Sequence, residues 1–444
     1  MAKFTPHTPE QIEEMLEVSG KKCIEELFED IPGELRTKKF SLPSGLTECE
    51  AFKVMKNLAG MNKRYYVSFL GGGFYDHYIP AAVESVASKP EFFTAYTPYQ
   101  PEASQGTLQA VFEYQTMAAK LTGMDVANAS LYDGGTALYE AVVMAVRSTR
   151  RSKIIIDEGI NPLFRRMLKT HVKNLDIQRV NVRTAGIKTD KEKLINEIDE
   201  NTAAVVAANP NFFGHIDDYS DVFEKAAQKG ALSVLCFYPM SLGVLKTPGE
   251  MGADIAVGEG QGLGMPLSFG GPYLGIIAAS KKYARKLPGR IAGETTDTEG
   301  KRAYVLTLQA REQHIRREKA TSNICSNQAL CALKAAVYMS LLGKRGFRDT
   351  ALINMQKAHR LRNGLKKIKG IKVIEGSFFN EFAVEVNGGA KAFVNKMLIK
   401  GFVPGLPAGL FYLDKENILV VNTTEKRTDN EMNMFLSAAQ EAMG

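Results

Sequence analysis

The run Leu232-Ser233-Val234-Leu235-Cys236-Phe237 is a short, uninterrupted apolar segment, typical of a strand that is buried on both faces of a sheet. Four similar runs occur elsewhere in the chain, at residues 153–156, 203–207, 255–257 and 274–277. None of them alternates apolar and polar residues, and the segments between them leave room for crossover helices. The pattern predicts an α/β domain in which these five runs are strands of a parallel sheet.

The two ends of the chain have a different pattern. Thr8-Pro9-Glu10-Gln11 has the hydroxyl, proline and glutamine of a helix N-terminus with a capping box, and Gly20 is expected to end that helix. Towards the C-terminus, a helical period at 327–342 is followed by alternating segments at 382–386 and 418–421. We therefore expect three parts: an N-terminal helical segment at 1–60, a large α/β domain at 61–300 and a smaller α+β domain at 301–444.

The composition excludes several classes of function. The 444 residues include 56 basic and 49 acidic ones, and the net charge of +7 is too small to indicate nucleic-acid binding. The N-terminus lacks the apolar core of a signal peptide, and charges interrupt the longest apolar stretches, so we expect a cytoplasmic protein without a membrane span. The five cysteines and six histidines are scattered, which argues against a disulfide framework and against a metal site.

One short loop has the composition of an anion site. Asp133, Gly134, Gly135 and Thr136 precede a helical period and would present free backbone N–H groups at the positive end of the helix dipole. An ordinary Asp or Thr cap would have the same sequence. The glycine-rich segment 258–264 fits neither nucleotide-binding pattern.

Two further segments have two interpretations each, and a third has one. Tyr96 to Gly106 is rich in aromatic, proline and amide groups and is either a loop that lines a site or a loop packed over the core. Arg311 to Lys319 is a solvated face, or else a subunit contact or anion anchor. Gly71 to Gly73 is interpreted as a flexible turn.

Several of these strings resemble the amino-terminal half of glycine decarboxylase, the P-protein. The most distinctive are YTPYQPEASQG at 96–106, YQTM at 114–117, MDVANAS at 124–130 and AREQHIRREKATSNIC at 310–325. The similarity covers nearly the whole chain, and its length matches the separately encoded α subunit that occurs where this enzyme is split in two. We therefore identify the chain as a member of that family.

The resemblance implies a fold, a reaction and partners. The fold is the aminotransferase-like fold type I of pyridoxal-phosphate enzymes, with a large, mainly parallel domain and a smaller α+β domain. The α subunit pairs with a β subunit and assembles into an α₂β₂ heterotetramer. Together they decarboxylate glycine on pyridoxal phosphate and transfer the aminomethyl group to the lipoyl arm of the H-protein.

Fold type I chemistry needs an acid beside the ring nitrogen of the cofactor and a lysine that holds its aldehyde. Where the catalytic half of the family reads DGANL, this chain begins with Tyr238, and where it reads DVVHLNLHK, this chain has residues 254–262. Gln261 and Gly262 therefore replace the His-Lys pair. The resemblance implies that the β subunit binds the cofactor, and that this chain holds none covalently and has no catalytic residue or metal of its own.

Partner chains of fold type I dimers supply loop residues to each other's sites. The segments that we expect to reach the β subunit contain Tyr96, Tyr99, Gln100, Gln105, Thr321, Ser322 and Asn323. Two other functions remain open. In the first, the chain is an autonomous pyridoxal-phosphate enzyme that recruits another lysine, such as Lys246. In the second, it is a scaffold that never touches substrate.

Overall fold

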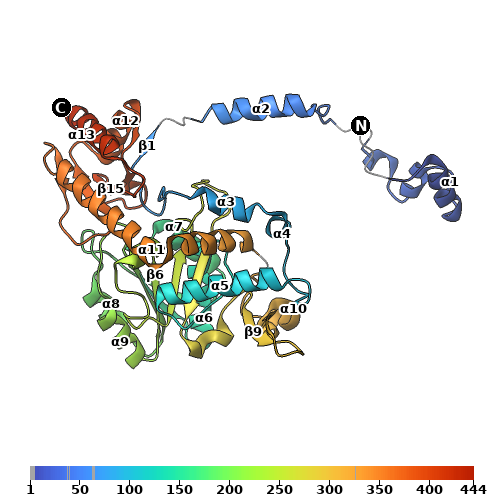
Figure 1. Ribbon diagram of the computed structural model, residues 1–444, viewed down its shortest axis with the longest axis horizontal. Coiled ribbons are helices and arrows are strands. Elements are labelled where there is room, and N and C mark those ends of the chain that lie inside the picture. The colour runs from blue at the N-terminus through green and yellow to red at the C-terminus, as the bar shows by residue number, and fades with distance from the viewer. Residues whose placement is uncertain (1–5, 38, 40, 63–65, 326) are drawn as a thin grey trace. The chain divides into compact units, whose positions relative to one another are not determined.

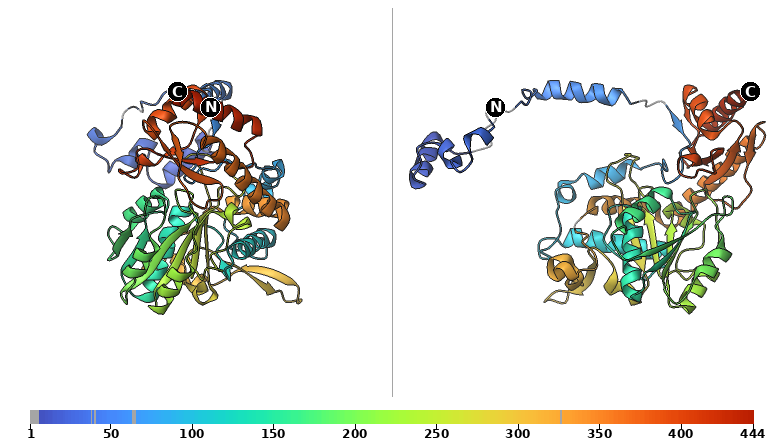
Figure 2. Two further views of the ribbon diagram at one scale, coloured as in Figure 1. Left: turned by 90° about the vertical axis from the view of Figure 1, so that its left-hand side faces the viewer. Right: turned by 180° about the vertical axis from the view of Figure 1, so that it is seen from behind.

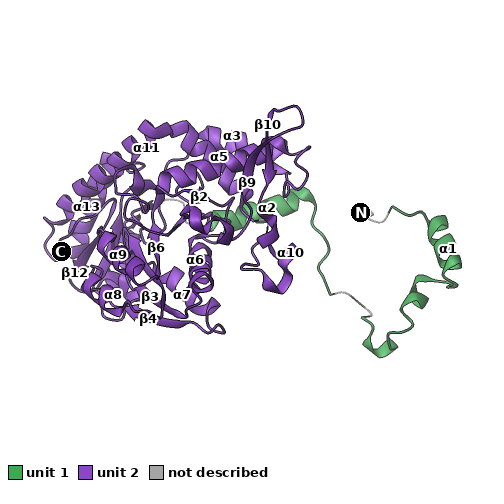
Figure 3. Cartoon of the chain, turned by 90° about the horizontal axis from the view of Figure 1, so that it is seen from below, with its two compact units in different colours: residues 1–64 green, residues 65–444 purple. Residues whose placement is uncertain are grey.

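A computed structural model describes residues 6–37, 39, 41–62, 66–325 and 327–444, and the chain divides into two compact units, Met1–Arg64 and Tyr65–Gly444 (Figure 3). The first unit contains helices α1 (Pro9–Val18) and α2 (Glu48–Gly60). Thr8 caps α1 as predicted, because its hydroxyl accepts from the Gln11 N–H and its own N–H donates to the Gln11 side chain over 2.9 Å. The predicted capping box is therefore confirmed.

The second unit is built on a seven-stranded sheet with the order β2-β8-β7-β6-β5-β3-β4. Its strands are β2 (Val126–Ala127), β3 (Lys153–Asp157), β4 (Gln178–Val182), β5 (Thr202–Asn209), β6 (Leu232–Phe237), β7 (Ile255–Glu259) and β8 (Gly275–Ala279). All five predicted runs are strands of this sheet, and four of them, β3, β5, β6 and β7, run parallel. Neither the two-residue β2 nor the polar edge strand β4 was predicted, because neither is an apolar run.

One prediction about this sheet is wrong, because β8 runs antiparallel to β7. Residues 260–274, which join these strands, contain no helix. A parallel neighbour needs a crossover connection, usually helical, whereas a short helix-free connection returns the chain in the opposite direction. The central sheet is consequently mainly, and not wholly, parallel.

Helices cover both faces of this sheet (Figures 1 and 2). Because successive strand residues point to opposite faces, Val234 packs in the core with α6 (Gly134–Thr149) and α7 (Pro162–His171), and Leu235 packs in the core with α8 (Lys191–Glu197) and α9 (Ser220–Gln228). Five further helices of the unit are α3 (Ala81–Ala87), α4 (Pro90–Phe93), α5 (Gln105–Thr122), α10 (Gln313–Arg316) and α11 (Ala329–Leu365). The first half of α11 packs with α5 beside β7 and β8.

A smaller antiparallel sheet of order β11-β12-β15-β14 lies in the C-terminal part of this unit. It contains β11 (Ile371–Val373), β12 (Glu381–Val386), β14 (Leu406–Pro407) and β15 (Ile418–Asn422), and it packs with α12 (Ala390–Ile399) and α13 (Asp429–Met443). Two pairs complete the structure: β1 (Val67–Ser68) with β13 (Phe402–Val403), and β9 (Ala292–Thr296) with β10 (Arg302–Leu306).

The helix predicted at 327–342 is the first half of α11, which bends at Gly343 (φ 59°) and continues to Leu365. The predicted domain boundaries stay predictions. Among the described residues, no helix is both long and apolar enough to cross a membrane.

Candidate active site

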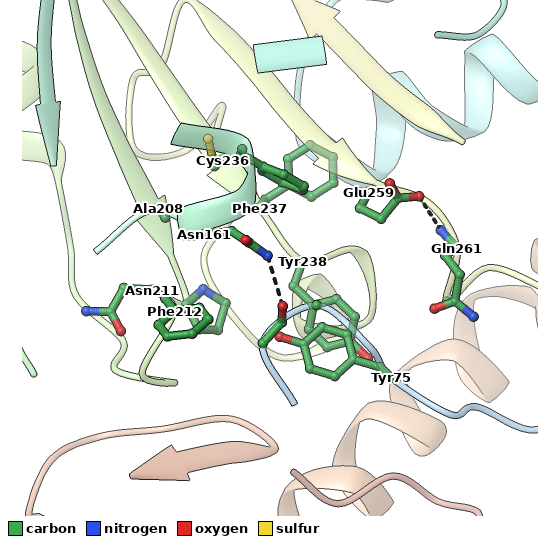
Figure 4. Close-up of a pocket in the computed structure, with 15 residues that line it drawn as sticks. Tyr75, Asn161, Ala208, Asn211, Phe212, Cys236, Phe237, Tyr238, Glu259 and Gln261 are labelled. Atoms are coloured by element: carbon green, nitrogen blue, oxygen red, sulfur yellow. Dashed lines mark hydrogen bonds between the residues drawn. The ribbon is translucent and has the colours of Figure 1, made fainter. Parts of the chain in front are cut away.

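A small cavity of about 70 Å³ lies at the carboxyl ends of β5, β6 and β7 (Figure 4). In open α/β sheets this edge is where ligands bind. Its lining includes Tyr238 after β6, Glu259 at the end of β7, and Gln261 and Gly262 in the following turn. The three positions that the resemblance singles out are thus neighbours in space.

Tyr238 is the end of a buried hydrogen-bond chain. Its hydroxyl bonds with Nε2 of His77, and Nδ1 of His77 lies 2.8 Å from Oε2 of Glu425. Glu425 also accepts from Nδ2 of Asn354 (2.9 Å) and from the N–H of Tyr78 (2.7 Å). Burial opposes ionisation of Glu425, but His77 and these donors outweigh it and lower the pKa to about 2. This site therefore holds a carboxylate, imidazole and phenol in series.

A second buried carboxyl supports the other side of the cavity. The ring centroids of Tyr75 and Tyr238 lie 4.3 Å apart. The hydroxyl of Tyr75 donates to Oε2 of Glu381 over 2.8 Å. The N–H of Gly72 donates to the other oxygen of Glu381. Burial raises the pKa of Glu381 to about 7. Gly71 to Gly73 is therefore a turn, as predicted, but it is packed and not free to move.

Gly262 has little space for a side chain. A Cβ atom built on Gly262 would lie 3.0 Å from Cδ2 of His77 and 3.7 Å from Cε2 of Tyr238. The neighbouring Gln261 is buried, and its amide donates to the carbonyl of Met265 over 2.6 Å. The place of the His-Lys pair is thus filled from within the chain.

The predicted anion loop lies at the N-terminus of α6, where the N–H groups of Gly134 and Thr136 have partners inside the chain. Oδ1 of Asp133 caps the helix by accepting from the N–H of Thr136 over 2.8 Å. The N–H of Gly134 donates to Oε2 of Glu259 over 3.0 Å. Oε1 of Glu259 accepts from the N–H groups of Gln261 (3.0 Å) and Leu274 (3.2 Å). Burial raises the pKa of Glu259 to about 7, although these three donors act in the opposite direction.

Side chains of α7 cover the same loop. A Cβ atom on Gly134 would come within 2.6 Å of the Phe164 ring, and one on Gly135 within 2.5 Å of the Met167 sulfur. The end of the helix is therefore in contact with Glu259, Phe164 and Met167. The N–H of Thr136 thus donates to an ordinary Asp cap, and that of Gly134 donates to a carboxylate of the same chain. The binding of an external anion at this loop stays a prediction.

The cross-interface candidates lie elsewhere. Tyr96 and Gln100 are exposed, Tyr99 accepts from Nη2 of Arg290 over 2.8 Å, and the Gln105 amide bonds with the backbone of Tyr304 in β10. Thr321, Ser322 and Asn323 line a separate hollow of about 390 Å³. None of the seven lines the cavity beside Tyr238, and whether they reach a partner stays a prediction.

The basic segment 311–319 is divided in two. Arg311 and Glu312 point inwards, since Arg311 donates to the carbonyl of Gly289 over 2.6 Å and Glu312 forms a buried ion pair with Arg290. The residues from 313 to 319 are exposed, as a solvated face would be.

A family model of the glycine cleavage system P-protein matches residues 2–438. This chain belongs to the P-protein family. A relative in Maridesulfovibrio salexigens, the probable glycine dehydrogenase (decarboxylating) subunit 1, is 51% identical over 433 residues, which are 97% of this chain and 98% of that protein. The crystal structure of a glycine decarboxylase (P-protein) in inhibitor-bound form superposes with a TM-score of 0.91 and is 41% identical, covering 99% of this chain and 100% of that chain.

More distant solved structures share only their fold with this P-protein chain. The glutamate decarboxylase of Lactobacillus brevis is 12% identical, with a TM-score of 0.70 over 92% of this chain and 95% of that chain. These comparisons confirm the predicted fold class, fold type I of the pyridoxal-phosphate enzymes. Fold by itself does not assign a function, so the site has to be tested residue by residue.

The residues of this P-protein chain do not fit covalently bound pyridoxal phosphate. Tyr238 occupies the position where the resemblance expects an acid beside the ring nitrogen, and a side chain on Gly262 would press on His77, which would have to move to accommodate a lysine. The described residues contain no group of three or more His, Cys, Asp or Glu that could hold a metal ion.

Sequence reasoning missed three residues that shape this site. His77 and Glu425 are 348 positions apart, and nothing in either local sequence indicates that they meet. Glu259 had a weak signal, because it is an acid between glycines immediately after a buried strand. Neither the comparison of that segment with nucleotide-binding loops nor its comparison with the cofactor-lysine segment of the family singled out Glu259.

Proposed function

We propose that this chain is the α subunit of a two-subunit glycine decarboxylase, and that it carries no cofactor lysine. The observation that supports this most directly is the packing of Gly262 against His77 and Tyr238 in a chain that matches subunit 1 relatives over their whole length. Decarboxylation of an amino acid on pyridoxal phosphate needs an imine-forming amine. We infer that this amine is on the β subunit.

The role proposed for the α subunit is to complete the β active site and to stabilise the assembly. We propose an α₂β₂ heterotetramer that uses the lipoylated H-protein as the acceptor of the aminomethyl group. Pyridoxal phosphate on the β subunit would supply the electron sink for loss of carbon dioxide. The loops that contain Tyr99 and Thr321 are our candidates for contact with that site. The five free cysteines favour a reducing compartment, so we place the enzyme in the cytoplasm.

Reconstitution tests this proposal. Each subunit is purified alone and as a co-expressed pair, and the exchange of labelled carbon dioxide with the carboxyl group of glycine is measured with lipoylated H-protein. We expect exchange only from the pair. Full exchange by the β subunit alone would show that this chain is a scaffold and would contradict the proposal.

A second measurement addresses the autonomous enzyme. The α chain is incubated with pyridoxal phosphate, reduced with borohydride and digested for peptide mapping. We expect no stoichiometric label on any lysine, including Lys246, whose ammonium group already pairs with Asp218 over 3.0 Å. A single labelled lysine with a matching near-visible absorbance band would overturn the assignment.

A further inference from the structure

A basic groove lies outside the site described above. It is lined by Arg165, Arg166, Lys169, Lys173 and Arg179, from helix α7, the loop after it and edge strand β4, and it encloses about 950 Å³. Among the residues that line this basic groove there is no carboxylate. Since the whole chain carries nearly as many acidic as basic residues, five cations around one hollow are a local concentration of charge.

Four of these five cations have no side-chain partner among the described residues. Arg165 is held by the carbonyl of Ile160 (3.2 Å) and by the ring of Tyr412. The side chains of the other four form no hydrogen bond or ion pair with any residue that the structure describes. Elsewhere in the unit, by contrast, Lys191 and Lys229 each pair with carboxylates. The unpaired charges repel one another, so an anionic partner would stabilise them.

Apolar side chains, called here the floor, also line the basic groove. They are Val172, Leu175 and Ile177, from the chain between α7 and β4, and Leu410 and Phe411, from a distant part of the sequence. The Leu410 side chain is 59% exposed although it borders the hollow. A basic rim over an apolar floor fits a partner that brings both carboxylates and apolar side chains.

We propose that the basic groove binds a carboxylate-rich, amphipathic segment of another protein. Nucleic acid fits less well, because the only aromatic ring in the lining is Phe411 and single strands bind through several stacking rings. A membrane surface is contacted by protruding apolar residues and not by a hollow. Cations on an edge strand also discourage sheet-to-sheet aggregation, which accounts for Arg179 but not for the residues of α7. The proposal does not depend on the catalytic role of the chain.

The test uses the full-length chain and a fluorescein-labelled 14-residue helical peptide of glutamate and leucine. Binding is followed by fluorescence anisotropy at about 0.15 M salt, where weak surface attraction is screened. The double variant Arg166→Glu/Lys169→Glu is expected to raise Kd at least about tenfold, because two attractive contacts become repulsive. Leu410→Ser should weaken binding by about threefold through the apolar floor.

The matched control is Lys369→Glu/Lys391→Glu, which makes the same change in net charge at two exposed lysines that have no partner among the described residues. We expect it to change Kd less than twofold. If the two double variants weaken binding equally, the attraction is non-specific and the proposal fails. If the charge reversals impair folding, Lys169→Ala/Lys173→Ala replaces them with a smaller expected effect.

Two competing probes identify the class of partner. A single-stranded DNA 14-mer and vesicles of phosphatidylserine are titrated against the same chain and variants. We expect both to bind more weakly than the peptide and to depend less on Leu410. Tighter, groove-dependent binding of either probe would overturn the assignment to an acidic protein segment.

Discussion

The N–H of Gly134, the first residue of helix α6, donates to Oε2 of Glu259 over 3.0 Å, so a carboxylate of this chain lies at the positive end of that helix. Helix N-termini favour anions, and Glu259 accepts there from two further N–H donors. This relationship suggests that Glu259 stabilises the loop in place of an external anion.

Removing this carboxylate should create a site for an inorganic anion. Glu259→Ala leaves three N–H groups without an acceptor, at a cost of roughly 1 to 3 kcal/mol for an unsatisfied buried donor. We expect a lower Tm, and we expect millimolar phosphate to restore part of it in the variant but not in the wild type. Differential scanning calorimetry with and without phosphate measures this.

The control for that experiment is Glu381→Ala. Glu381 is buried, whereas Glu259 is partly buried, and Glu381 also accepts from a backbone N–H, that of Gly72, but it does not lie at a helix N-terminus. Its destabilisation should not respond to phosphate. Equal recovery of both variants would mean that phosphate acts as a general stabiliser.

The packing around Gly262 predicts a steric effect. Gly262→Ala should destabilise the fold by about 1 to 3 kcal/mol, because its Cβ would press against His77 in a packed region. Gly106→Ala in α5 is the comparison, since a Cβ there meets nothing within 4 Å, and it should be neutral or slightly stabilising. Urea denaturation measures the free energy of unfolding of both variants. A Gly262→Ala variant as stable as the wild type would show that the turn moves freely.

Glu425 should make the fold sensitive to acid. Its pKa is lowered from 4.5 to about 2 in the folded chain, so its contribution is present above pH 4.5 and is lost as pH falls towards 2. The total is on the order of 3 kcal/mol. Glu425→Gln should therefore show a flatter stability profile between pH 4.5 and 2. Parallel profiles for wild type and variant would contradict this assignment.

Glu381 should act in the opposite direction. Its pKa is raised to about 7, so the folded chain binds a proton that the unfolded chain has released, and stability falls as pH rises from 4.5 through 7. Glu381→Gln mimics the protonated form and should remove part of that slope, again on the order of 3 kcal/mol. Denaturant melts at several pH values between 5 and 8 measure it, and an unchanged slope would refute it.

Tyr99 allows contact within the chain to be separated from contact with the partner. Tyr99→Phe removes only the hydroxyl that accepts from Arg290, whereas Tyr99→Ala also removes the half-exposed ring. If the ring contributes to the β active site, exchange by the reconstituted pair should fall about tenfold or more in Tyr99→Ala and change little in Tyr99→Phe. Similar activity of the two variants would remove Tyr99 from the interface candidates.

Local features of this chain could be predicted because their causes are local. The hydroxyl and amide of Thr8 and Gln11 lie within one helical turn, so the capping box is visible in the sequence. The run at 232–237 is apolar throughout because both faces of β6 are covered. The replacements at Tyr238 and Gly262 are also readable directly, since chemistry that needs an acid and a lysine cannot use a phenol and a hydrogen atom.

By itself, then, the sequence determined five strands of the central sheet and the capping box of α1, and the loss of the two cofactor-binding groups stays a prediction. Only the tertiary structure decided what takes their place: His77 and Glu425 reach Tyr238 from opposite ends of the chain, Glu259 accepts from Gly134, and β8 turns back beside β7. The physical reason is the distance along the sequence over which each effect acts. Propensity and periodicity act over a few residues, whereas buried hydrogen bonds form only where distant segments are brought together by packing.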